Sequence, residues 1–196
     1  MEDSTYIVLP PEISAIKKKT TEVQFTMGSE PLVGAMLRTL AASKPGGRFL
    51  ELGTGTGIAT AWLLNGMDAD STLISVDNES AVQQVAGDLL GADRRLTLVT
   101  SDGLEFLRSQ SAESFDFVFA DAMPGKYEGL DEALACVRAG GFYVIDDMLP
   151  QPNWPDGHAA RVPVLIERLA SHPNFETLPL VWASGVVVAV RKRSEI

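Results

Sequence analysis

Three glycines directly after a short apolar run are the residues of this sequence best suited to chemistry. Residues 48–52 read as a strand, Gly53, Gly55 and Gly57 follow at alternate positions, and residues 58–64 read as a helix. Glycines let a ligand approach the backbone closely, and the start of a helix offers unpaired N–H groups. The pattern is therefore typical of a nucleotide-binding turn, although tight packing of a strand against a helix also uses glycines.

The glycine spacing and a neighbouring acid discriminate between nucleotides. Gly-x-Gly-x-Gly differs from the Gly-x-Gly-x-x-Gly that holds a pyrophosphate. Glu51 stands just before the turn, where a carboxylate repels phosphate and attracts a cation. A nucleoside that carries an amino acid and a positive charge fits better, which predicts S-adenosylmethionine. Its predicted contacts here are Glu51, Gly53, Thr54, Gly55 and Gly57.

Two further acids follow strand-like runs. Asp77 ends the second run, 24 residues after Gly53, where an acid can accept hydrogen bonds from both ribose hydroxyls. Asp77 and Asn78 are also suited to a turn or a helix cap, which is the alternative. Asp102 follows the third run and could accept a hydrogen bond from an adenine amino group. We therefore count Asp77, Asn78 and Asp102 among the candidate cofactor contacts.

Three carboxylates stand where the fourth and fifth predicted strands end. Asp121 follows the apolar run 115–120, and Asp146 and Asp147 follow the run 142–145. Because neighbouring parallel strands end at one edge of a sheet, these side chains should converge. Crowded carboxylates repel one another unless a positive charge lies among them, and oxygen ligands suit Mg²⁺, Ca²⁺ or Mn²⁺. The sequence predicts a divalent-cation site here; helix capping or water binding is the alternative.

These residues need a framework that brings strand ends together, and the sequence alternates strand-like and helix-like segments accordingly. We expect an α/β fold, a doubly wound seven-stranded and mostly parallel sheet with a C-terminal antiparallel hairpin. It forms a single domain over residues 1–196, with N-terminal helices in 12–45 and the core in 46–193. The irregular stretch 150–155 follows the fifth strand, at the edge where ligands bind. Strands are expected at 48–52, 72–77, 96–100, 115–120, 141–145, 175–182 and 185–191, and helices at 12–20, 29–43, 58–66, 80–90, 103–110, 127–138 and 159–171.

Bulk properties narrow the class of protein. The chain has 196 residues, of which 45% are hydrophobic and 21% charged, enough for one globular domain. No apolar run approaches a membrane span, and residues 1–5 lack the basic and apolar regions of a signal peptide. The net charge of −10 argues against a nucleic-acid partner. A single cysteine, Cys136, excludes an internal disulfide and should be buried on a helix, so we expect a cytoplasmic protein.

With these residues placed, the sequence resembles the class I S-adenosylmethionine-dependent methyltransferases over about residues 12–193. Within them it is similar to the cation-dependent O-methyltransferases, the catechol and caffeoyl-coenzyme A enzymes and their bacterial relatives. Residues 51–57 correspond to the family's cofactor loop, and Asp77 to its ribose-binding acid. Residues 25–29 resemble the segment that lines the family's cofactor pocket, which implies Met27 as a cofactor contact.

The resemblance also implies roles for the carboxylates at the strand ends. Residues 117–121 match the strand whose terminal aspartate is a metal ligand in relatives, so Asp121 is a candidate for both the cofactor pocket and the metal. Asp146 and Asp147 match an Asp-Asn metal pair, with the asparagine replaced by aspartate. In relatives the ion orients a substrate hydroxyl beside the methyl donor.

The residue that would take the proton from the acceptor hydroxyl differs from the one in the relatives. Relatives carry a lysine three residues after the first metal aspartate, but here Pro124 stands at that position and Lys126 follows two residues later. The backbone turn would have to bring Lys126 round to the site. His158, after the irregular stretch, is a second candidate base and equally a helix-start residue. Trp154 could wall the acceptor pocket or pack at the surface.

The sequence therefore predicts S-adenosylmethionine-dependent O-methylation of a small hydroxylated molecule, assisted by a divalent cation, in a homodimer without membrane contact. Three alternatives use the same fold class. They are methylation of a modified tRNA base, a Rossmann-type oxidoreductase, and a non-catalytic cofactor-binding protein. The net charge of −10 opposes the first, and the glycine spacing together with Glu51 opposes the second.

Overall fold

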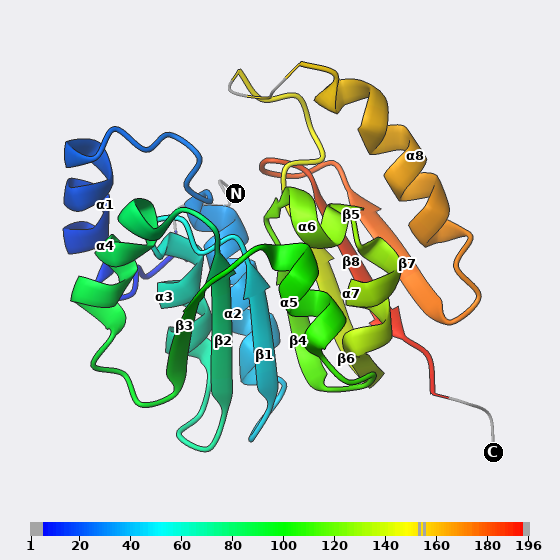
Figure 1. Cartoon of the computed structure of the whole chain (residues 1–196), viewed down its shortest axis with the longest axis horizontal. Helices are drawn as coiled ribbons and strands as arrows, with labels where there is room; N and C mark the ends of the chain where they lie inside the picture. The colour runs from blue at the N-terminus through cyan, green and yellow to red at the C-terminus, as the bar shows by residue number, and fades with distance from the viewer. Residues whose placement is uncertain (1–5, 153, 155, 194–196) are drawn as a thin grey trace.

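The computed structural model describes residues 6–152, 154 and 156–193. Its centre is a seven-stranded sheet in the order β3-β2-β1-β4-β6-β8-β7, parallel from β3 to β6 and antiparallel from β6 to β7 (Figure 1). The predicted doubly wound sheet with its C-terminal antiparallel strands is therefore confirmed. The strands are β1 (Arg48–Leu52), β2 (Thr72–Asp77), β3 (Leu96–Thr100), β4 (Phe115–Ala120), β6 (Val137–Ile145), β7 (Phe175–Leu180) and β8 (Val186–Arg191).

Helices cover both faces of this sheet (Figure 1). One layer consists of α1 (Ile13–Glu22), α2 (Pro31–Ala42), α3 (Ile58–Gly66) and α4 (Ser80–Leu90). The other consists of α5 (Gly103–Ser109), α7 (Leu130–Cys136) and α8 (His158–Ala170). In the part of the chain that the structure describes, no helix is both long and apolar enough to cross a lipid bilayer.

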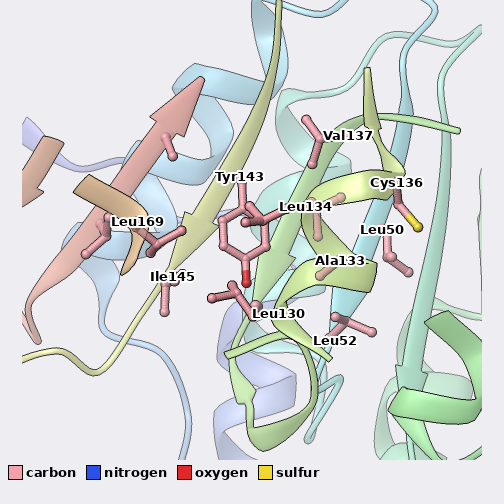
Figure 2. Packing of buried hydrophobic residues seen from close by; sticks show 14 of the residues in the cluster. Leu50, Leu52, Leu130, Ala133, Leu134, Cys136, Val137, Tyr143, Ile145 and Leu169 are labelled. Carbon is pink, nitrogen blue, oxygen red and sulfur yellow. The ribbon is translucent and has the colours of Figure 1, made fainter. Parts of the chain in front are cut away.

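The strands read as nearly continuous apolar runs because both of their faces are buried. Successive residues of β1 point to opposite faces, so Phe49 packs under the layer of α1 to α4, whereas Leu50 and Leu52 pack under α5, α7 and α8. Figure 2 shows the cluster under α5, α7 and α8, where Leu130 of α7 lies beside the buried side chain of Tyr143. Cys136 is buried on α7, as expected.

The helix predicted over residues 127–138 is wrong at both ends. The chain first makes the short turn α6 (Met123–Lys126) and the two-residue strand β5 (Tyr127–Glu128), and α7 begins only after Gly129. Gly129 has φ of 69°, in the left-handed region, which separates the turn from the helix. Val137 already belongs to β6. The apolar residues of this segment are typical of a buried helix, but local propensity does not show that the chain bends twice within it.

The carboxyl ends of β2, β4 and β6 lie at one edge of the sheet, and the chain beyond each end carries the acids singled out from the sequence. The irregular stretch after β6 is also observed: residues 150–152 and 154 belong to no helix or strand. Its remaining two positions, 153 and 155, lie outside the described residues. This edge is therefore the part of the fold that can assemble a site.

Candidate active site

A cavity of about 260 Å³ lies over the glycine turn between β1 and α3. Gly53 and Gly55 line it, and the surrounding protein leaves little room for a side chain at either position: a Cβ on Gly53 would lie 3.0 Å from the carbonyl carbon and oxygen of Asp121, and one on Gly55 would lie 3.1 Å from the ring of Phe25. Both glycines have positive φ, 101° and 51°, which favours glycine. Gly57 differs, because it does not line the cavity and packs against Ala86 of α4.

The cavity brings together most of the residues predicted to contact the cofactor. Asp77 is fixed at its edge, since its Oδ2 accepts the N–H of Gly55 at 2.7 Å and its Oδ1 accepts the N–H of Glu79 at 2.9 Å. Asp102 lies in an adjoining hollow of about 70 Å³ and caps α5 by accepting the N–H of Glu105 at 2.9 Å. The predicted contacts that line the main cavity are Met27, Gly53, Thr54, Gly55, Asp77, Asn78 and Asp121.

Glu51 is the predicted cofactor contact that lies elsewhere. It points to the same face of β1 as Phe49, so its side chain is fully buried under α3 and does not line the cavity. Its Oε2 accepts hydrogen bonds from the hydroxyls of Thr60 at 2.6 Å and Ser75 at 2.5 Å, whereas Oε1 has no partner. Burial raises the pKa of Glu51 to about 7, against the opposing effect of the two hydroxyls. The expectation that this carboxylate faces a cationic ligand is therefore corrected.

Replacing Glu51 by glutamine is expected to flatten the pH dependence of stability. A carboxyl whose pKa rises from 4.5 to about 7 on folding stabilises the folded state fully below pH 4.5. This contribution, up to about 3 kcal/mol, is lost as the pH rises through the folded-state pKa. Urea titrations at about pH 5 and about pH 8 would measure the free energy of unfolding. Glu105→Gln, at an exposed site, is the matched control. If the unfolding free energy of Glu51→Gln changed with pH as much as that of wild type, Glu51 would not be the source of the pH dependence.

A second cavity, of about 360 Å³, adjoins the first. Asp146, Asp147 and Ser184 line it from the end of β6 and the turn before β8, opposite the segment that precedes α2. Four residues line both cavities: Met27, Gly28, Ser29 and Asp121. Asp121 is the one carboxylate in that shared set. The junction of the two cavities is therefore where a group bound in one can react with a group bound in the other.

The carboxylate of Asp121 is held from two sides. Its Oδ2 accepts a hydrogen bond from the hydroxyl of Ser29 at 3.1 Å, and its Oδ1 lies 3.4 Å from the Nζ of Lys126. Both side chains of the ion pair are almost fully buried, at 10% and 4% exposure. Burial raises the pKa of Asp121 well above its usual value, with Asp146 and Asp147 adding to this and Lys126 opposing it.

Lys126 reaches Asp121 because the turn α6 bends back under the strand ends. Pro124 is extended, with ψ of 136°, and Gly125 has φ of 87°, so the chain reverses within two residues. The hydroxyl of Tyr143 donates a hydrogen bond to the carbonyl of Gly125, and Figure 2 shows the ring inside the core. The required return of Lys126 to the site, five positions after Asp121, is therefore observed.

His158 lies at the start of α8 and does not line either cavity among the described residues. Its Nε2 pairs with the hydroxyl of Tyr127 at 3.0 Å, and its ring stacks on Trp154 with a centroid distance of 4.4 Å. Burial lowers the pKa of His158, and the charge of Lys126 acts in the same direction. This cluster anchors the irregular stretch to α8, which favours the helix-start interpretation of His158 and the packing interpretation of Trp154.

Asp146 and Asp147 do share the cavity with Asp121, as the strand ends predicted. The Oδ1 of Asp146 accepts hydrogen bonds from the hydroxyl of Ser184 and from the N–H of Asp147, the latter at 2.7 Å. Asp147 has φ of 63°, an uncommon conformation for a residue other than glycine. Within the described residues, however, no three His, Cys, Asp or Glu side chains are grouped as ligands for a metal ion.

Sequence reasoning missed three residues of this site. Ser29 was seen only as the end of a cofactor segment, yet it bonds to Asp121. Ser184 belongs to a turn that lies far from Asp146 in sequence, and no local signal could have paired the two. Tyr143 read as an ordinary core residue of a strand. A buried tyrosine needs a hydrogen-bond partner, and that rule was the available signal.

Comparison with known proteins identifies the family. Residues 50–148, about half of the chain, match a family model described as a methyltransferase domain. A protein of Mycobacterium marinum named "Putative O-methyltransferase" is 33% identical over 171 residues, covering 82% of this chain and 76% of that relative. A protein of the same name from Mycobacterium ulcerans is 29% identical over 171 residues, with the same two coverages, 82% and 76%.

Solved structures share the fold. The O-methyltransferase of Bacillus cereus, solved in complex with S-adenosylhomocysteine (SAH), aligns with a TM-score of 0.82 and 20% identity, over 97% of this chain and 94% of that one. The O-methyltransferase TomG of Streptomyces achromogenes, solved with S-adenosylmethionine, aligns with a TM-score of 0.80 and 22% identity, over the same fractions, 97% and 94%. The sequence matches show more than a shared fold: this chain belongs to the family of O-methyltransferases.

Proposed function

We propose that this enzyme transfers the methyl group of S-adenosylmethionine to the hydroxyl of a small molecule bound in the 360 Å³ cavity. The observation that carries the proposal is the meeting of two cavities at one buried carboxylate, Asp121. A methyl donor in the first cavity and an acceptor in the second would both reach that point. Alignment of donor and acceptor supplies much of the acceleration in such a displacement.

The residues around the glycine turn fit S-adenosylmethionine. Gly53 and Gly55 line the cavity without a side chain, and Asp77 is held at its edge, where a ribose would need an acceptor. When bound, the cofactor supplies a methyl group on a positively charged sulfur. The carboxylate of Asp121 lines that cavity as well, so its negative charge would favour the sulfonium over the neutral thioether product.

In this proposal Asp121 acts on the acceptor. The acceptor hydroxyl would donate a hydrogen bond to the Asp121 carboxylate and lose its proton to it as the new carbon–oxygen bond forms and the methyl–sulfur bond breaks, which would leave the neutral thioether. The raised pKa of Asp121 suits a base, because a carboxylate with an ordinary pKa accepts a proton poorly at neutral pH. Ser29 fixes the carboxylate in the direction of the junction between the two cavities. Lys126 lies at its other oxygen and, as an ammonium ion, does not act as the base.

The divalent cation predicted from the sequence does not fit the donor atoms as they lie. The positive charge of Lys126 lies 3.4 Å from Oδ1 of Asp121 and opposes a second cation there, and the described part of the chain holds no grouped set of three ligands. Asp146 uses Oδ1 for Ser184 and for the backbone. No step of the proposed reaction is assigned to such an ion.

The charge of the second cavity narrows the class of acceptor. Its lining includes Glu30, Asp121, Asp146 and Asp147, and none of the described residues that line it is Lys or Arg; Lys126 pairs with Asp121 but does not line the cavity. An anionic acceptor would meet repulsion, so we infer a neutral or positively charged hydroxyl compound. The same charge disfavours the phosphate backbone of a tRNA.

Two measurements test the proposal. Calorimetry should find binding of SAH and none of NADH, which discriminates against the oxidoreductase alternative. Methyl transfer from labelled cofactor should then favour tyramine, a cationic phenol, over 4-hydroxyphenylacetate, its anionic counterpart of similar size. SAH binding without methylation of any compound in a broad hydroxyl panel would favour a non-catalytic cofactor-binding protein instead.

We further propose that the chain acts as a homodimer in the cytoplasm. The large apolar side chains exposed near α1 and α2, Tyr6, Val8, Val23 and Met27, support a contact with a second copy. The single cysteine, Cys136, is free and buried, which is consistent with a reducing compartment.

A further inference from the structure

The burial of Lys126 is unusual for a lysine, and cofactor binding does not explain it. Its side chain is 4% exposed, although lysine is among the residues least often buried unless paired. Its partner is Asp121, with Nζ 3.4 Å from Oδ1. A solvated loop lysine would lie at the surface, so the burial of this one requires a specific reason.

The fold holds Lys126 at this place with several contacts. A Cβ on Gly125 would lie 2.6 Å from Leu52, and Tyr143 donates a hydrogen bond to the Gly125 carbonyl. Pro124 packs against the start of α5, because a Cβ on Gly103 would lie 2.7 Å from it. Contacts with the core and with α5 therefore fix this turn, and the turn places the ammonium of Lys126 next to Asp121.

The surrounding charges show what the ammonium does. Asp121, Asp146 and Asp147 line one cavity, and three carboxylates crowded together repel one another. Such a group needs a positive charge nearby, which a divalent ion would supply from outside and a buried lysine supplies from the chain. The arrangement favours the lysine, since its ammonium lies 3.4 Å from Oδ1 of Asp121 and would repel a second cation there.

We propose that the Lys126 ammonium is the built-in cation of this acceptor site, in the place of a divalent metal ion, so that methyl transfer does not require metal. Lys126 is then a positioning residue: it keeps the Asp121 carboxylate charged and aimed at the junction of the two cavities. The effect of Lys126 on catalysis rests on the proposed function. Its effect on metal binding can be tested whether or not that function is correct.

Binding of Mn²⁺, followed by electron paramagnetic resonance, tests the inference without an acceptor substrate. Wild-type protein should bind Mn²⁺ weakly, whereas Lys126→Met, which leaves the three carboxylates without the ammonium, should bind it at least about tenfold more tightly. Lys126→Arg keeps the charge and should bind as weakly as wild type. The matched control is Lys19→Met, which removes an exposed lysine paired with Glu22 and should change nothing. Tight Mn²⁺ binding by wild type, or no gain in Lys126→Met, would overturn the inference.

Measurements of methyl-transfer activity are the second test of the role of Lys126. Methyl transfer by wild type should be unchanged after treatment with excess EDTA, and Lys126→Met should lose kcat by about a hundredfold. SAH binding by Lys126→Met confirms that the variant is folded. If SAH binds but no acceptor is methylated, the proposed function fails while the Mn²⁺ result still decides the role of Lys126. If methylation occurs and EDTA abolishes it, the role of Lys126 fails while the proposed function stands.

Discussion

Replacing Asp121 by asparagine is expected to lower kcat by about a thousandfold while SAH affinity changes by less than about threefold. The amide keeps the shape of the carboxylate and can still accept a hydrogen bond from Ser29 or Lys126, but it cannot take a proton from the acceptor. Because Asp121 lies where the two cavities meet, the loss should fall on the chemical step. Single-turnover rates and calorimetric titration of one preparation measure both quantities.

The control for this variant is Asp131→Asn. Asp131 is an exposed carboxylate on α7 that pairs with Arg168 at 2.9 Å, so its replacement removes an acid and an ion pair away from the site. It should leave both kcat and SAH affinity as in wild type. Loss of SAH affinity together with activity in Asp121→Asn would show that Asp121 serves the cofactor. An unchanged kcat would remove it from the reaction altogether.

Replacing Gly53 by alanine is expected to weaken SAH binding by at least about a hundredfold and to destabilise the fold by about 1–3 kcal/mol. Gly53 has φ of 101°, which alanine adopts only with strain, and the new methyl group would lie 3.0 Å from the backbone of Asp121. Either the turn or the end of β4 must move. Both line the cofactor cavity, so the ligand site changes in either case.

Gly46→Ala separates the effect of backbone strain from the effect of the close contact with Asp121. Gly46 also has positive φ, 64°, but a Cβ there would meet nothing within 4 Å. This variant therefore reports backbone strain alone and should retain wild-type SAH affinity, as measured by calorimetry. Urea titration of both variants gives the change in unfolding free energy. Equal SAH affinities in the two variants would mean that the approach of Gly53 to Asp121 has no part in binding.

Patterns within single segments are enough to predict the sheet and the residues at which its strands end. Local patterns suffice here: apolar runs such as 48–52 and 72–77 have the length of buried strands, and glycines or acids stop them. Helices interleave with these runs, and parallel strands with right-handed connections leave few ways to arrange them. The meeting of Asp121, Asp146 and Asp147 in one cavity followed from that arrangement.

Which of these side chains face a ligand depends on how the strands, turns and helices pack together. Glu51 and Gly53 are two residues apart, yet one is buried under α3 and the other lines the cavity, because the strand alternates its faces while the turn does not. Gly57 carries the same motif but serves packing against α4.

The position of Lys126 also lay beyond the sequence. Its distance from Asp121 depends on a backbone reversal at Pro124 and Gly125 that is fixed by Tyr143, a residue of another strand. Local propensity predicted helix just after this reversal, where the chain in fact bends. The charge of the acceptor site is therefore set by long-range contacts, which no residue pattern within one segment encodes.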